Sequence, residues 1–169
     1  SEYAEKVVPY VDENAHLFIL VQLSESTQEA TDAQKEACFQ ALSSKGYFVQ
    51  SVTEPEHVTA VWMVRRNSFT LMRDNNAEGF RAMPCIEDVI VPLPALGTFI
   101  HKLITILELR GIIYGFHGHI GDGSFRVVPI FDFRKADAVD EIFGLMDEVF
   151  ELIKSVRGNM SADHSDGII

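Results

Sequence analysis

Cysteine, uninterrupted apolar runs and positive charge are all scarce in this chain. It has 169 residues and two cysteines, Cys38 and Cys85, whose separation matches no metal-ligand spacing. We therefore expect both to be buried thiols in a reducing compartment. Two cysteines are also too few to hold an iron–sulfur cluster. The formal net charge is -11, and such an acidic surface repels phosphate, which argues against a nucleic-acid partner. The longest apolar stretch, 99–109, contains charged residues and a histidine, so we expect no transmembrane segment.

The chain also lacks a glycine-rich stretch that could cradle a pyrophosphate, because Gly118, Gly121 and Gly123 belong to a hairpin pattern. The chain is, however, rich in apolar residues: 47% of its residues are hydrophobic, which suffices for a sizeable core. It begins without Met and ends on two apolar residues after a turn signal. We therefore expect residues 1–169 to be a single domain taken from a larger protein.

Hydrophobic periodicity predicts two rounds of strands and helices. Strands are expected at 16–23, 47–52, 86–91, 112–119 and 124–131, and helices at about 31–46, 57–72, 92–110 and 137–156. Thr31 and Gln34 resemble a capping box at the start of the first helix. Apolar residues at helical spacing should face inward from the last two helices: Leu96, Phe99, Ile100, Leu103 and Leu107 in 92–110, and Val139, Ile142, Phe143, Met146, Phe150 and Ile153 in 137–156. The order β-α-β-α, then β-α-β-β-α, is typical of an α+β fold. We predict a ferredoxin-like antiparallel sheet with helices packed on one face.

The stretch from His117 to Arg126 is the most informative part of the sequence. His117 and His119 flank a glycine, and in a strand they point to the same face. That face could hold a metal or an acidic substrate. From the spacing alone an ordinary hairpin is the better interpretation, because two histidines are weak evidence for a metal site.

Two further polar patterns are ambiguous when each is taken alone. Asp163 and His164 follow the last predicted helix, where an acid could bind a metal and an imidazole could move a proton. The simpler interpretation is a helix-terminating loop. Arg65 and Arg66 could bind a carboxylate through a guanidinium fork, although a solvated basic helix face is the simpler interpretation of this pair.

Taken together, these patterns resemble a known family. Trp62-x-x-Arg65, the run 86–92, the Gly-His-Ile-Gly-Asp-Gly motif at 118–123 and Ser-Ala-Asp-His at 161–164 occur in that order. The series is similar to the C-terminal domain of FAD-linked oxidases, a family that includes D-lactate dehydrogenase, the FAD subunit of glycolate oxidase and D-2-hydroxyglutarate dehydrogenase. The resemblance implies the substrate-side domain of an oxidoreductase that passes hydride from a D-2-hydroxy acid to FAD.

The resemblance also implies roles for individual residues. His119 matches a histidine ligand and Asp163 a glutamate ligand of a divalent metal such as zinc; Arg65 matches an arginine that holds the substrate carboxylate, and His164 the group that takes the hydroxyl proton. Arg126, however, stands where the family has a second histidine ligand. A guanidinium has no lone pair for a metal. Either Arg126 replaces the metal as the cation that binds the carboxylate, or it pairs with Asp163 and the site is degenerate.

The resemblance further implies which partners the chain has. FAD is held mainly by a separate domain of the parent chain, so the isolated chain is expected to be inactive. The small-molecule partner is a lactate-, glycolate- or 2-hydroxyglutarate-like acid. We expect a cytoplasmic location, or a peripheral place at a membrane through the parent protein. Two other hypotheses stay open: a non-catalytic packing or interaction module of the same fold, and a stand-alone ligand-binding domain with no flavin partner.

Overall fold

The computed structural model describes residues 2–12, 14–15 and 17–162. The chain forms two compact units, Ser1–Asn67 and Ser68–Ile169. Helix α3, Pro55–Asp74, contributes its larger part to the first unit and its last two turns to the second. Among the described residues, no helix is both long enough and apolar enough to cross a bilayer.

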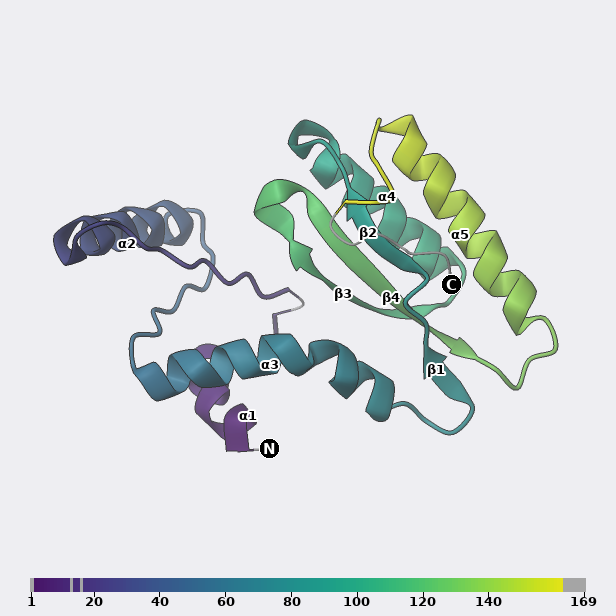
Figure 1. Cartoon of the computed structure of the whole chain (residues 1–169), viewed down its shortest axis with the longest axis horizontal. Coiled ribbons are helices and arrows are strands. Elements are labelled where there is room, and N and C mark those ends of the chain that lie inside the picture. Colours follow the sequence, from purple (N-terminus) through teal and green to yellow (C-terminus); the bar gives the residue numbers. More distant parts are fainter. Residues whose placement is uncertain (1, 13, 16, 163–169) are drawn as a thin grey trace. The chain divides into compact units, whose positions relative to one another are not determined.

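An antiparallel sheet forms the centre of the second unit (Figure 1). Its middle strand is β4, Ser124–Asp132, which pairs along its length with β3, Ile113–His119. Two short strands, β1 (Phe80–Ala82) and β2 (Ile86–Ile90), pair with successive parts of β4. The β3–β4 hairpin confirms the prediction made from its glycine-rich turn, and the antiparallel sheet with helices confirms the α+β class.

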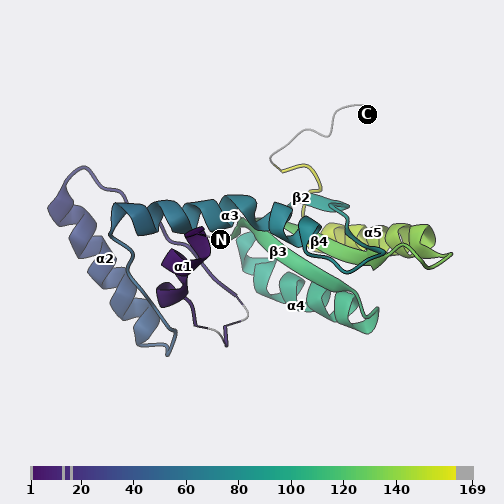
Figure 2. The same ribbon diagram turned by 90° about the horizontal axis from the view of Figure 1, so that it is seen from below.

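Two helices cover one face of this sheet. Helix α4, Leu93–Leu109, runs below β3 in Figure 2, and α5, Ala138–Ser155, lies beside α4. The predicted apolar stripe of α4 is confirmed: Phe99, Leu103 and Leu107 are fully buried, and Leu96 and Ile100 are partly buried against the same core.

The predicted stripe of α5 is partly wrong. Val139 and Phe143 were expected to face inward, but they are 55% and 60% exposed. Ile142 and Ile153 of the predicted stripe are buried as expected, and Met146 and Phe150 are partly buried against the core. The other buried positions of α5 are Ala138, Leu145 and Val149. Apolar residues occur on both sides of this helix, so periodicity alone did not select the face that meets the sheet.

The first unit is helical. It contains α1 (Glu2–Val7), a 3-10 turn (Val8–Tyr10), α2 (Gln28–Ser43) and most of α3. Polar contacts join its first turns to α3: Lys6 Nζ lies 2.9 Å from a carboxylate oxygen of Glu56, and the Tyr10 hydroxyl lies 2.6 Å from His57 Nδ1.

Three local predictions for this unit are wrong. The described residues of 16–23, and all of 47–52, form no strand, and their apolar side chains from Leu17 to Val21 are 47–65% exposed. A strand-forming composition produces a strand only where a second strand pairs with it. The N-cap of α2 is also not the Thr31–Gln34 box. The hydroxyl of Thr27 accepts the Ala30 N–H instead, and the helix begins three residues earlier than Thr31.

Candidate functional site

The candidate site lies on the face of the β3–β4 hairpin that is turned away from α4 and α5. Phe125 points to the core, where its ring stacks on Phe116 at a centroid distance of 5.1 Å. Because side chains alternate along a strand, Arg126 points to the opposite face. Cross-strand pairing sets His117 opposite Arg126 and His119 opposite Ser124. The hairpin therefore brings His117, His119 and Arg126 to one face, as the sequence predicted for the two histidines.

Two glycines of the motif are required by the backbone. Gly123 ends the turn with φ 73, in the left-handed region, and a Cβ there would overlap the carbonyl oxygen of Val91. At Gly118 a Cβ would overlap the backbone of Ser124 and Phe125 on the partner strand. The glycine between the histidines thus allows β3 and β4 to approach closely, and this approach fixes the positions of both histidines.

The C-terminal end of α3 limits the same face within the second unit. A Cβ on Gly115 would overlap the Met72 side chain, so Met72 lies directly over β3 at this point. Gly115 is two residues before His117, on the same side of the strand. An apolar thioether therefore borders the polar group of His117, His119 and Arg126.

A residue that the sequence analysis did not single out is central to the site. Asp88 on β2 is 2% exposed, and its Oδ1 lies 3.1 Å from Nη2 of Arg126. The Arg126 side chain is 29% exposed. A carboxylate buried this deeply is stable only with a cationic or hydrogen-bonding partner. The sequence carried one signal for it, because an acid between the apolar residues Ile86 and Val89 is unusual in a buried strand.

The segment after α5 comes back to β2 at this place. Asn159 and Ile90 exchange two backbone hydrogen bonds, each 2.9 Å long. The Ala162 N–H then donates to the carbonyl oxygen of Asp88 at 2.9 Å. Asp163 and His164, which the sequence analysis proposed as a metal ligand and a proton acceptor, follow Ala162 directly in the chain but lie outside the described residues.

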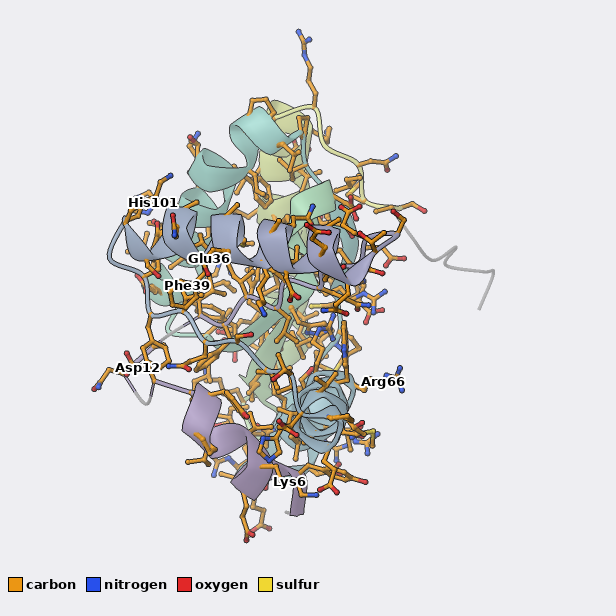
Figure 3. All side chains as sticks on the ribbon, turned by 90° about the vertical axis from the view of Figure 1, so that its left-hand side faces the viewer. Lys6, Asp12, Glu36, Phe39, Arg66 and His101 are labelled. Atoms are coloured by element: carbon orange, nitrogen blue, oxygen red, sulfur yellow. The ribbon has the colours of Figure 1, made fainter. Side chains whose placement is uncertain are left out.

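The arginine pair at 65–66 belongs to the other unit. Arg65 is half-buried on α3, in Ser1–Asn67, whereas the hairpin belongs to Ser68–Ile169. Arg66 is exposed, and Figure 3 shows its side chain extending away from the helix. Arg66 therefore matches the solvated helix face that was the simpler interpretation of this pair.

The donor atoms of the described residues do not fit a zinc site. Within 2–12, 14–15 and 17–162, no three His, Cys, Asp or Glu side chains gather closely enough to hold a metal. Arg126, at the position of the family's second histidine ligand, offers no lone pair and adds positive charge. Asp163, the remaining candidate ligand, lies outside the described residues.

Comparison with known proteins assigns the family. The family model for FAD linked oxidases, C-terminal domain, matches residues 2–169. D-2-hydroxyglutarate dehydrogenase of Pseudomonas putida is 31% identical over 114 residues, which make up 67% of this chain and 11% of that relative. The proteins of the same name from Escherichia coli and Pantoea ananatis are 28% and 26% identical, each over 65% of this chain and 11% of the relative. The chain therefore belongs to the family of C-terminal domains of FAD linked oxidases.

Proposed function

We propose that the whole protein containing this chain is an FAD-dependent dehydrogenase of a D-2-hydroxy acid, and that this domain binds the carboxylate of the acid. Lactate-, glycolate- and 2-hydroxyglutarate-like acids all carry this head group. The names of the three relatives favour 2-hydroxyglutarate among these candidates. The observation that carries the proposal is Arg126, a cation held beside two histidines on one strand face in a chain of this family.

The face has the groups that a 2-hydroxy acid requires. The guanidinium of Arg126 can donate paired hydrogen bonds to the carboxylate. His119, at the exposed end of β3, can donate to or accept from the hydroxyl group. On the resemblance to the family, Arg65 is a second residue for the carboxylate. His164 takes the hydroxyl proton as the hydrogen on C2 leaves as hydride.

FAD, when bound, accepts that hydride. We propose that another domain of the whole protein holds it, because this chain has no glycine-rich stretch for the pyrophosphate. The test is the visible absorbance of the purified 169-residue chain, which we expect to show no flavin. A retained yellow cofactor would overturn this part of the proposal.

We further propose that substrate binding here does not use zinc, since Arg126 supplies the positive charge at the position of a family ligand. Elemental analysis of the purified whole protein should find no stoichiometric zinc. One zinc per chain would refute this, and would make His119 and Asp163 the first residues to test as ligands.

A second function remains a candidate because of the Asp88–Arg126 ion pair. An arginine committed to a buried carboxylate can serve packing alone, and the domain would then be a non-catalytic module of the same fold. The two candidates differ in what happens when Arg126 is changed: a packing arginine affects the free energy of unfolding, whereas a substrate arginine affects kcat/KM.

The deciding experiment is steady-state kinetics on the whole protein with D-lactate, glycolate and D-2-hydroxyglutarate and an artificial electron acceptor. We expect one acid to be oxidised, and Arg126→Gln to lower kcat/KM about 10- to 100-fold, the value of a lost charged hydrogen bond. Arg65→Ala and His164→Ala should each abolish the activity. Arg134→Gln is the matched control, because Arg134 is exposed and pairs with Asp132 just beyond β4. No turnover of any acid would favour the non-catalytic module.

A further inference from the structure

The backbone at Asp88 is unusual. Between the pairs Ile86–Val127 and Val89–Phe125, β2 advances one residue more than β4, which defines a β-bulge. Asp88 lies in this bulge with φ 54, in the left-handed region that few residues other than glycine, asparagine and aspartate adopt readily. The extra residue returns both Ile86 and Val89 to the core, where each is 0% exposed.

The bulge directs two groups of Asp88 to different partners. Its carboxylate bonds Nη2 of Arg126 at 3.1 Å, and its carbonyl oxygen accepts the Ala162 N–H at 2.9 Å. One residue therefore contacts both the cation of the hairpin face and the segment that leads to His164. Glu87, the other acid of the bulge, is exposed.

The two partners of the ion pair differ in their exposure to solvent. Its carboxylate end is 2% exposed and its guanidinium end 29% exposed, so the buried partner anchors an arginine that reaches the surface. A long arginine side chain has many rotamers, and fixing it before a ligand arrives reduces the entropy lost on binding. Such an arrangement suits an arginine that must meet a carboxylate in one orientation.

We propose that Asp88 is a positioning residue for carboxylate binding: it holds the Arg126 guanidinium in the orientation that the substrate carboxylate meets. This inference rests on the proposed function. Asp88 does not touch the substrate; it acts through Arg126.

The test is Asp88→Asn in the whole flavin-containing protein. Asparagine keeps the size, tolerates the left-handed backbone and retains a side-chain oxygen that can accept from Arg126, but it removes the negative charge, so the ion pair is lost. We expect kcat/KM for the 2-hydroxy acid to fall about tenfold. We also expect the Kd of oxalate, a carboxylate without an oxidisable C–H bond, to rise about tenfold, as measured by calorimetry. Glu87→Gln makes the same chemical change one residue away and should alter neither quantity.

Two further measurements show whether Asp88 acts on oxalate binding through Arg126 or through the C-terminal segment. In an Arg126→Gln background, Asp88→Asn should not weaken oxalate binding further, because the residue acts through the arginine. Hydrogen exchange at the Ala162 amide should stay as slow as in the wild-type protein, since the carbonyl oxygen that it bonds is retained. Loss of protection at Ala162 would assign the effect to the C-terminal segment and overturn the role through Arg126.

The remaining outcomes are also decisive. Tighter oxalate binding by Asp88→Asn would mean that Asp88 competes with the ligand for Arg126, which is the opposite of positioning. Unchanged kcat/KM and Kd with a lower melting temperature would leave a purely structural ion pair, and the inference would be wrong. A wild-type protein that oxidises none of the acids refutes the proposed function itself, whereas an active wild type with an equally active Asp88→Asn refutes only this inference.

Discussion

The turn of the hairpin contains two glycines whose replacement by alanine should have very different consequences. A Cβ on Gly121 would have no atom within 4 Å, whereas a Cβ on Gly123 would overlap the carbonyl oxygen of Val91. Gly123 also has φ 73, which disfavours any residue that carries a side chain. The two positions share one turn, so each serves as the control for the other.

The expected cost follows from these two effects. Alanine in the left-handed region costs about 1–2 kcal/mol. The overlap falls on backbone, which cannot rotate away like a side chain, and overpacking of this kind adds about 1–3 kcal/mol. We expect Gly123→Ala to lower the free energy of unfolding by about 2–5 kcal/mol in sum, and Gly121→Ala to change it by less than about 0.5 kcal/mol.

Urea unfolding of the 169-residue chain, followed by far-ultraviolet circular dichroism, measures both changes. Gly123→Ala should move the midpoint to lower urea at an unchanged slope. Gly123→Asn should be milder, because asparagine tolerates the left-handed region and keeps only the overlap. Equal stability of the two alanine variants would refute the reasoning, and so would an asparagine variant no better than the alanine variant.

Three other perturbations have defined outcomes. Phe99→Ala removes a fully buried ring of α4 and should lower the free energy of unfolding by about 3–5 kcal/mol. Leu109→Ala, at an 84% exposed position of the same helix, should change it little. Equal losses of stability would contradict the packing described for α4. The hydrogen bond from Arg134 lowers the pKa of Asp132 from 3.8 to about 2, so the stabilisation by this pair is complete above pH 3.8 and is lost as the pH falls toward 2. NMR titration of the Asp132 carboxyl group should give this lowered pKa, and Arg134→Ala should raise the pKa back toward 3.8. An unchanged Asp132 pKa in the variant would exclude Arg134 as the cause. Burial raises the pKa of the Cys85 thiol to about 11, so alkylation by iodoacetamide at pH 8 should be far slower in the folded than in the unfolded chain, and equal rates would rule out the burial.

Several parts of the fold could be predicted because their signals are local. The turn glycines of the hairpin and the helical spacing of apolar residues in α4 each describe a structure formed by neighbouring residues. The strands expected at 16–23 and 47–52 failed for the opposite reason. Their composition favours strands, but a strand also needs a pairing partner, and composition does not specify one.

The candidate site could likewise be predicted only in part from the sequence. His117 and His119 could be placed on one face from strand alternation alone, and the family could be recognised from ordered motifs. The position of Arg126 as a departure from the family was also visible in the sequence. Its effect on metal and substrate binding stays a prediction.

The sequence by itself determined the α+β class, the family and the hairpin, because these depend on periodicity, turn chemistry and motif order. Only the tertiary structure revealed Asp88 as the partner of Arg126, across 38 positions of the chain. The bulge that turns the backbone of Asp88 follows from the pairing of β2 with β4, and its contact with Ala162 follows from the return of the C-terminal segment. The ion pair, the bulge and the hydrogen bond to Ala162 all depend on contacts between residues distant in sequence. Local sequence patterns do not specify such contacts, which form only when the whole chain packs.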